Sequence, residues 1–200
     1  MSNIAFVLGN GTSRELINPN KLRSIGKIYG CNALYRTFAP DHLVAVDAKM
    51  VREIAGSGYQ NKHSVWTNEN KNYKNIPNLN YFRPSKGWSS GPTALWLASR
   101  HCYKTIYILG FDYTGLNDGA TVNNIYADTP NYKSSRATAT YHGNWLKQTR
   151  QTIKENPEIK YVRVTEPRGF IPKELVNIKN IKHIKMDEFM QIFPSLYDDQ

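Results

Sequence analysis

Short apolar runs alternate with amphipathic segments along most of the chain. Residues 4–8 (Ile-Ala-Phe-Val-Leu) are apolar without interruption, and residues 105–109 (Thr-Ile-Tyr-Ile-Leu) are nearly so. Continuous apolar runs are typical of strands that are covered on both faces. Both segments are therefore predicted to be central strands of a parallel sheet. The further predicted strands are 28–32, 43–47, 161–164, 181–185 and, as a short edge strand, 64–67.

Helical segments separate these strands. The predicted helices are 14–25 (broken near Pro19), 49–55, 93–100, 142–155 and 187–193. The third of them opens at Ser89-Ser90-Gly91-Pro92, where a serine N-cap and a proline in the first turn favour helix initiation. Strands that alternate with helices imply right-handed βαβ units. We expect one α/β domain over residues 1–200, Rossmann-like, with a mostly parallel sheet and helices on both faces.

Residues 113–141 interrupt this alternation. They are rich in Gly, Asn, Asp and Thr and show no sustained period. Segments of that length without regular structure in a compact domain are usually functional or disordered. We interpret this segment as a lid-like insertion over an active site.

The composition is that of a globular protein, with 40% hydrophobic and 21% charged residues. No apolar run approaches the roughly 18–20 residues that span a bilayer. The first residues lack the basic region and cleavage site of a signal peptide, so we expect a cytoplasmic protein. The two cysteines, Cys31 and Cys102, lie in segments that we interpret as buried, which indicates packing thiols.

The net charge is +10, from 26 Lys and Arg against 16 Asp and Glu. Such an excess favours an anionic partner: a nucleotide, a nucleic acid or an acidic lipid surface. The basic residues are scattered, although the last third of the chain is rich in them. A solvated basic face is the favoured explanation, and a nucleic-acid groove or peripheral contact with an anionic surface is the alternative.

In open α/β sheets, ligands bind beyond the carboxyl ends of the strands. Gly9-Asn10-Gly11-Thr12-Ser13 follows the first predicted strand, although Arg14 leaves the G-x-G-x-x-G pattern incomplete. Glycines let a backbone approach a phosphate, and helix N-termini bind anions. We therefore predict a phosphate-bearing nucleotide at this loop. The predicted contact residues are Gly9, Asn10, Gly11, Thr12, Ser13, Asn32, Asp47, Ser89, Ser90, Gly91 and Asp112.

Several of these positions have a structural explanation too. The glycine loop can be a plain tight turn. Asp47 can be the N-cap of the helix that follows it, and Asp112 can cap a turn. Asn32 can form an Asx-turn rather than face a ligand.

His142 stands where the predicted lid gives way to a helix. An imidazole titrates near neutral pH, which suits a general base, although a polar helix start explains the residue as well. No histidine pair has helical metal-ligand spacing and no Cys cluster exists, so we predict no metal site. A G-x-S-x-G nucleophile elbow is also absent.

Three blocks of the chain resemble the bacterial sialyltransferases of glycosyltransferase family 42. Residues 9–13 are similar to that family's GNGPS opening, and Tyr29-Gly30-Cys31-Asn32-Ala33-Leu34-Tyr35 is similar to its CNxFY element. Ser90-Gly91 followed by residues 103–113 resembles its SG…GYKEIYLxGIDFY block. The resemblance covers roughly residues 4–47 and 89–165.

The resemblance implies an inverting, metal-independent transfer of a sugar from a CMP-type nucleotide-sugar donor, without a cofactor. His142 would deprotonate the hydroxyl of an acceptor glycan or other acceptor, and Asn10, Asn32 and Ser90 would contact the donor. Tetramers in that family suggest a homo-oligomer.

Two departures from the family pattern concern the donor. Thr114 and Ala120 stand where the family has two lid tyrosines on the leaving phosphate, and Asp47 replaces a frequent Asn. The nearby Tyr113 and Tyr126 are candidate substitutes, as are Lys133 and Arg136.

The Gly9-Asn10-Gly11 start and the order of Ser90-Gly91, helix, strand and Gly110-Phe111-Asp112 carry a second resemblance, to the archaeal pterin pyrophosphokinases and their bacterial relatives of unknown function. It implies pyrophosphoryl transfer from ATP, with Asp47 and Asp112 helping to hold Mg²⁺. A non-catalytic module that binds a nucleotide or a nucleic acid is the third hypothesis, which the basic charge suggests.

Overall fold

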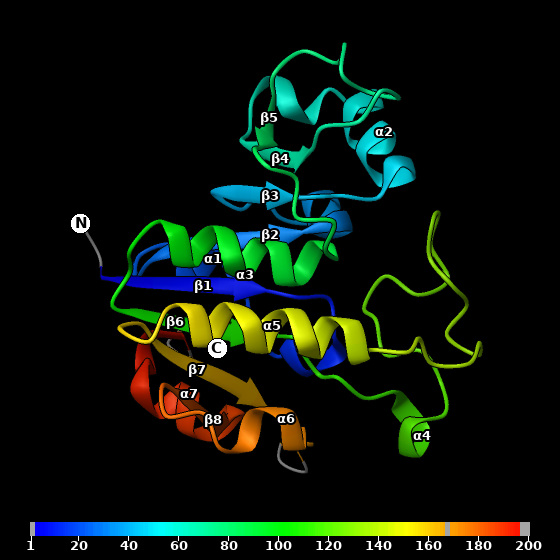
Figure 1. Ribbon diagram of the computed structural model, residues 1–200. Coiled ribbons are helices and arrows are strands. Elements are labelled where there is room, and N and C mark those ends of the chain that lie inside the picture. The colour runs from blue at the N-terminus through cyan, green and yellow to red at the C-terminus, as the bar shows by residue number, and fades with distance from the viewer. Residues whose placement is uncertain (1–2, 167–168, 197–200) are drawn as a thin grey trace.

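The fold was determined as a computed structural model, which describes residues 3–166 and 169–196. Its centre is a single eight-stranded sheet in which every strand pair is parallel (Figure 1). The strand order is β5-β4-β3-β2-β1-β6-β7-β8. The predicted α/β, Rossmann-like class is confirmed. The strands are β1 (Ile4–Leu8), β2 (Lys27–Cys31), β3 (His42–Val44), β4 (Val65–Asn68), β5 (Leu79–Phe82), β6 (Thr105–Leu109), β7 (Lys160–Thr165) and β8 (Ile181–Lys185).

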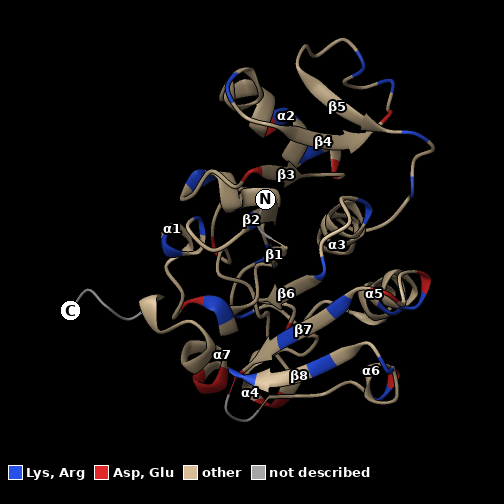
Figure 2. Cartoon of the chain, turned by 90° about the vertical axis from the view of Figure 1, so that its left-hand side faces the viewer, with Lys and Arg blue, Asp and Glu red and all other residues tan. Residues whose placement is uncertain are grey.

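Strand order places β1 at the point where the chain reverses its direction of travel across the sheet. The chain first builds outward from β1 to β5 and then returns to place β6 on the other side of β1 (Figure 2). Leu8 at the end of β1 pairs in register with Leu109 at the end of β6. A crevice therefore opens beyond the carboxyl ends of these two strands, where α/β sheets bind ligands.

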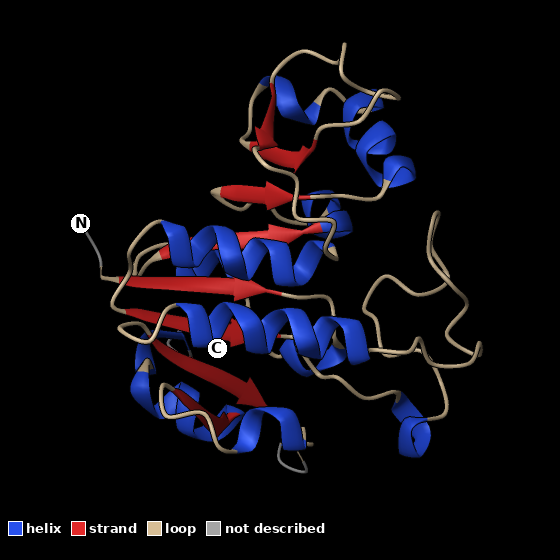
Figure 3. Cartoon of the chain, viewed as in Figure 1, coloured by secondary structure: helices blue, strands red, loops and turns tan. Residues whose placement is uncertain are grey.

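Helices cover both faces of the sheet (Figure 3). The α-helices are α1 (Pro19–Leu22), α2 (Ala48–Gly56), α3 (Ser90–Arg100), α4 (Leu116–Gly119), α5 (Gly143–Glu155), α6 (Lys173–Val176) and α7 (Met186–Ile192). The short 3-10 helices are η1 (Thr12–Arg14), η2 (Asn32–Arg36), η3 (Tyr59–Asn61) and η4 (Pro194–Leu196).

Strand β1 shows why its sequence is apolar throughout. Ala5 and Val7 pack in one cluster with α3, α5 and α6, whereas Phe6 and Leu8 pack in the other, which includes α7. All four side chains are at most 1% exposed. A strand buried on both faces has no position for a polar residue.

Three predictions of local structure were wrong. The helix expected over 14–25, broken near Pro19, is instead two short pieces, η1 and α1. α1 begins at Pro19 and is capped by the Asn18 side chain, which accepts from Asn20 N at 3.0 Å. β4 is not the edge strand, since β5 pairs outside it. Cys102 is exposed, and only Cys31 is the buried thiol that was expected of both.

The segment between β6 and α5 contains little regular structure beyond α4 and two isolated bridges, Leu116↔Thr121 and Thr121↔Thr138. No helix in the described ranges is both long and apolar enough to cross a bilayer.

Candidate functional site

A cavity of about 170 Å³ lies at the crevice between the ends of β1 and β6. The ends of β1, β2 and β6, the start of α3, the lid and the start of α5 form its wall. Ten of the predicted site residues line it: Gly9, Asn10, Gly11, Asn32, Ser89, Ser90, Gly91, Asp112, Tyr113 and His142. Four others do not: Thr12, Ser13, Asp47 and Tyr126.

Four of the five backbone amides of the glycine loop, those of Gly9, Gly11, Thr12 and Ser13, are already paired. Gly9 N donates to the Leu109 carbonyl at 2.8 Å, and Gly11 N donates to the Gly110 carbonyl at 2.9 Å. The next two amides donate to side chains: Thr12 N to Asn123 Oδ1 at 2.9 Å and Ser13 N to Asp112 Oδ2 at 3.1 Å. These four groups are therefore occupied, and the loop does not offer the amide cradle that its glycines suggested.

The glycines serve the contact between two loops instead. A Cβ at position 9 would lie 2.5 Å from the Gly110 carbonyl oxygen, and one at position 11 would collide with the Asp112 carboxylate. Only glycine lets the loop after β1 pack this closely against the loop after β6. The buried guanidinium of Arg14, at the position where the dinucleotide pattern has glycine, donates back to the Gly9 carbonyl.

Asp112 and Asn123 tie the loop after β1 to the lid. The Asp112 carboxylate accepts hydrogen bonds from the amide and hydroxyl of Ser13 and, at 3.0 Å, from Asn123 Nδ2. Asn123 Oδ1 in turn accepts from the amide and hydroxyl of Thr12, both at 2.9 Å. Asp112 thus caps the turn at η1, as its structural explanation proposed. Sequence reasoning missed Asn123 because the lid is rich in asparagine and no local pattern distinguishes this one.

Unpaired donors face the cavity at the start of α3. The amides of Ser90 and Gly91 donate to no group in the described part of the chain, and Pro92 has no amide hydrogen. The Ser90 hydroxyl accepts from Val46 N at 3.1 Å, which fixes the helix start against the end of β3. Free amides and the helix dipole of this eleven-residue helix make the position suitable for an anion.

Asn32 provides an unpaired acceptor at the end of β2. Its backbone φ is 52°, a left-handed conformation that asparagine tolerates better than most residues. Its Oδ1 is buried and has no hydrogen-bond partner among the described residues. A buried acceptor without a partner costs free energy, which a donor on a bound ligand would recover.

Asn10 and Cys31 complete this wall of the cavity. Asn10 Nδ2 donates to the Cys31 carbonyl at 3.3 Å, so the asparagine side chain links the ends of β1 and β2. Burial raises the pKa of the Cys31 thiol to about 12. The thiol therefore stays protonated near neutral pH and is a packing group rather than a nucleophile.

His142 is the N-cap residue of α5, and its carbonyl accepts from Leu146 N at 3.0 Å. Its ring makes no hydrogen bond to residues 3–166 or 169–196 and stacks on Tyr141 with an interplanar angle of 19°. The imidazole lines the same cavity as Asn32 and the start of α3. Because no hydrogen bond from the described residues holds the ring, both ring nitrogens are available to a ligand.

Three other predicted residues have structural roles in this geometry. Asp47 is the N-cap of α2, accepting from Lys49 N at 2.9 Å, as its alternative explanation held. Tyr126 is buried against Thr37, with 2.9 Å between their hydroxyl oxygens. Tyr113 lines the cavity, but its buried hydroxyl bonds to Thr149, and burial raises its pKa.

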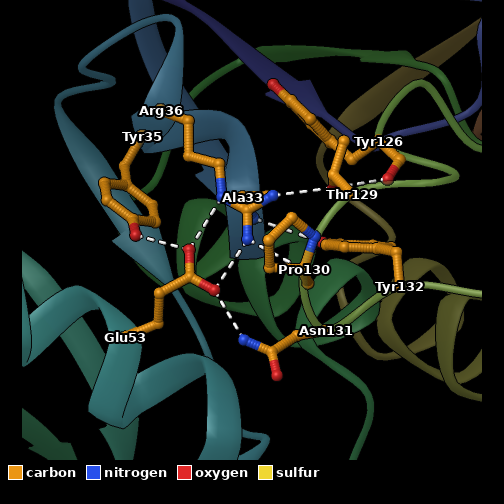
Figure 4. Close-up of polar contacts among 9 residues, drawn as sticks. All are labelled: Ala33, Tyr35, Arg36, Glu53, Tyr126, Thr129, Pro130, Asn131 and Tyr132. Atoms are coloured by element: carbon orange, nitrogen blue, oxygen red, sulfur yellow. Dashed lines mark hydrogen bonds and ion pairs between the residues drawn. The ribbon is translucent and has the colours of Figure 1, made fainter.

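The far part of the lid is fastened to the β2–α2 region (Figure 4). Arg36 makes a two-pronged ion pair with Glu53, with Nε–Oε1 and Nη2–Oε2 distances of 2.7 and 2.6 Å. The same guanidinium donates to Thr129 Oγ1 and to the Pro130 carbonyl, while Asn131 Nδ2 donates to Glu53 at 2.6 Å. We call Arg36, Glu53, Thr129, Pro130 and Asn131 the latch.

A Glu53→Gln variant is expected to loosen the lid at neutral pH. The ion pair and hydrogen bonds from Arg36, Tyr35 and Asn131 lower the pKa of Glu53 from 4.5 to about 2. The stability that the charged Glu53 adds to the wild-type protein is therefore fully present above pH 4.5. It is lost as the pH falls through about 2, where Glu53 becomes protonated. Amide hydrogen exchange at residues 126–133 should speed up in the variant at pH 7, and the stability difference from wild type should shrink towards pH 3.

Glu69→Gln is the matched control, because Glu69 pairs with Arg83 at the surface and both side chains are more than half exposed. Exposed pairs contribute little, so this variant should exchange like wild type. Unchanged exchange at residues 126–133 in Glu53→Gln would show that the latch does not hold the lid.

No known protein-family profile, characterised protein or solved structure matches this chain. Within residues 3–166 and 169–196, no three His, Cys, Asp or Glu side chains gather as metal ligands would.

Proposed function

We propose that the protein is a glycosyltransferase that moves a sugar from a CMP-type nucleotide-sugar donor to an acceptor hydroxyl, with His142 as general base. The observation that carries the proposal is the position of His142 on the same cavity as Asn32 and the α3 N-terminus. The residues that we assign to nucleotide recognition and the candidate base therefore line one cavity.

The anionic group of the donor fits the start of α3. The free amides of Ser90 and Gly91 would bind the phosphate, and the helix dipole would stabilise the negative charge that develops on the departing CMP. The buried Oδ1 of Asn32 would accept from an exocyclic amine or a ribose hydroxyl. This assignment puts the phosphate at α3 rather than at the glycine loop, four of whose five amides are occupied.

The reaction then requires one proton transfer at His142. The acceptor oxygen forms a bond to the anomeric carbon as the bond from that carbon to the phosphate oxygen breaks. The hydroxyl proton passes to the imidazole, and CMP leaves with its negative charge next to the α3 amides. General-base catalysis of this kind contributes about 10²–10⁴-fold to the rate.

The lid has to move for a whole donor to bind. Cavities that hold drug-sized ligands measure about 300–1,000 Å³, whereas this one measures about 170 Å³. The lid residues Val122, Asn123 and Asn124 form part of its wall. Displacement of this segment would enlarge the site while the latch holds the far part of the lid.

The geometry favours the pyrophosphokinase hypothesis less. Asp47 does not line the cavity and caps α2, so it is not paired with Asp112 across the site. The Asp112 carboxylate is itself engaged by Ser13 and Asn123. The two carboxylates would have to leave these partners to share a Mg²⁺ ion.

Nucleotide binding is the direct test. In a thermal-shift panel of CMP, CDP, UDP, GDP, ADP and ATP with and without Mg²⁺, we expect CMP to stabilise the fold independently of the metal. At about 100 times its dissociation constant, the ligand should add roughly 2.7 kcal/mol of stability. Asn32→Gly should reduce this shift, because glycine adopts φ 52° without strain and removes only the side chain.

Asn78→Gly is the matched control: Asn78 also has a positive φ, of 62°, but is exposed and lies outside the cavity. It should retain the full CMP shift. A shift only with ATP and Mg²⁺, or a CMP shift that Asn32→Gly leaves intact, would contradict the proposed donor site.

A further inference from the structure

Three of the four tryptophans gather on one side of the sheet, at the end formed by β4 and β5. Trp66 of β4 stacks on Phe82 of β5, with 5.4 Å between the ring centroids and an interplanar angle of 26°. Phe82 makes an edge-to-face contact with Trp96 of α3, at 5.6 Å. Trp88 lies in the segment that joins β5 to α3. Phe82 is buried, whereas the three indoles are only partly buried.

This side of β4 and β5 has no covering helix in the part of the chain that the structure describes. On the opposite side, Val65 of β4 and Tyr81 of β5 pack in the cluster that contains the α2 residues. On the tryptophan side, α3 packs on β1, β2 and β3, and only the segment 83–89 runs past β4 and β5 (Figure 2). A partly exposed aromatic face without a cover is a candidate interaction surface.

Two cations rest on these rings. Lys86 Nζ lies 4.5 Å from the centroid of the Trp88 ring and 4.9 Å from that of Trp96. The Arg100 guanidinium lies 6.0 Å from the Trp96 centroid. Neither cation has a carboxylate partner among the described residues. We call these residues the tryptophan surface: Trp66, Trp88, Trp96, Lys86 and Arg100.

We propose that the tryptophan surface binds single-stranded nucleic acid. Bases stack on aromatic side chains, and the stacking tolerates any sequence because every base has a π-face. Lysine and arginine beside the rings neutralise the phosphates that join the stacked bases. The net charge of +10 attracts such a polyanion. The inference goes beyond the proposed function, because no residue of this surface lines the cavity.

The chemistry of the surface favours a single strand over an acidic protein or a duplex. An acidic peptide supplies negative charge but no flat groups to stack on the indoles. A duplex keeps its bases stacked on one another, so it offers only its phosphates. A single strand offers both groups. DNA and RNA strands share them, so both should bind.

The test is fluorescence anisotropy of full-length protein with labelled poly(dT) and poly(U) strands of about 12 nucleotides. Trp88→Ala should bind about tenfold more weakly than wild type, the loss expected for one stacked base. Trp88→Phe should bind nearly as well as wild type, because phenylalanine keeps a ring for stacking. Lys86→Ala should reduce the salt dependence of log affinity by about 0.7 in slope, for one lost phosphate contact.

Two variants are matched controls. Phe170→Ala removes a ring that is 47% exposed beyond β7, and Lys62→Ala removes an exposed lysine that follows η3. Both should bind the strands like wild type. A duplex and polyglutamate should bind about tenfold more weakly than the single strand, because neither can stack on the indoles. Saturating CMP should not displace the strand, and an unchanged melting temperature shows that each variant is folded.

Wild-type protein that binds neither strand, or Trp88→Ala that binds like wild type, would overturn the inference. Polyglutamate that binds as tightly as the strand would also overturn it, because charge alone would then explain the affinity. Displacement by CMP would place the strand in the cavity instead. Strand binding that depends on Trp88 and Lys86, together with no thermal shift by CMP, would refute the proposed donor site and support this surface.

Discussion

A His142→Ala variant is expected to transfer sugar about 10²–10⁴ times more slowly than wild type, the range that general-base catalysis contributes. The loss should fall on kcat, because the imidazole acts on the acceptor proton rather than on the nucleotide. Stability should hardly change, since the His142 side chain makes no capping hydrogen bond to α5. The measurement is a single-turnover assay of sugar transfer, with the CMP thermal shift recorded on the same samples.

His63→Ala is the control histidine variant, because His63 is exposed, packs on Tyr59 and lies outside the cavity. It should transfer at the wild-type rate. Added imidazole should restore part of the activity of His142→Ala, which a purely structural defect would not allow. Transfer that survives the loss of His142, at a rate close to wild type, would remove this residue from the mechanism.

The strands could be predicted well because their pattern is local. The observed β6 and β8 have the predicted limits, Thr105–Leu109 and Ile181–Lys185. Burial explains the success for β6, in which four of the five residues are buried, but not for β8, in which only Ile184 is buried. The short β5 was missed because it lies in a polar, asparagine-rich stretch, in which its one buried residue, Phe82, makes no pattern. α6 was missed for a similar reason, with Leu175 its one buried residue.

The site was predictable to the extent that strand ends determine it. Asn32, Ser90 and His142 were chosen from separate segments, and the parallel sheet brings all three to one cavity. What the sequence did not reveal are the partners that occupy polar groups. Four backbone amides of the glycine loop donate hydrogen bonds to residues about 100 positions away, from Leu109 to Asn123. Such pairing depends on tertiary approach, which no local motif records.

Arg163 is the clearest example of a residue whose partners depend on tertiary approach rather than on a local motif. It lies in β7, is 2% exposed, and has no carboxylate partner among the described residues. Its guanidinium donates to the carbonyls of Phe111, Asp112 and Phe170 at 2.8, 3.1 and 2.9 Å. It also lies over the Tyr113 ring, 5.3 Å from the centroid. Arg163 thus fixes the chain as it leaves β6 and enters the lid.

Burial lowers the pKa of Arg163, yet an arginine remains charged under all ordinary conditions. The cost of burying this charge is offset by its three carbonyl contacts. In Arg163→Met those carbonyls lose their donor, at about 1–3 kcal/mol for each buried group left unpaired. Part of this is recovered because methionine needs no desolvation of a charge. The net expectation is a loss of about 3 kcal/mol, large against the roughly 5–15 kcal/mol that stabilises a typical domain.

Urea denaturation measures this loss as a lower midpoint with an unchanged slope. Arg163→Lys should fall between wild type and Arg163→Met, because one ammonium keeps the charge but cannot reach three carbonyls in a fixed plane. Arg150→Met is the control: Arg150 is exposed on α5, so its loss should change stability by no more than about 0.5 kcal/mol. If Arg163→Met were as stable as wild type, water would have to donate to these three carbonyls, because one carbonyl oxygen cannot donate to another. The loop after β6 would then be held by the hydrogen bonds of Asp112 and Asn123 to the loop after β1, and the CMP shift should persist in this variant.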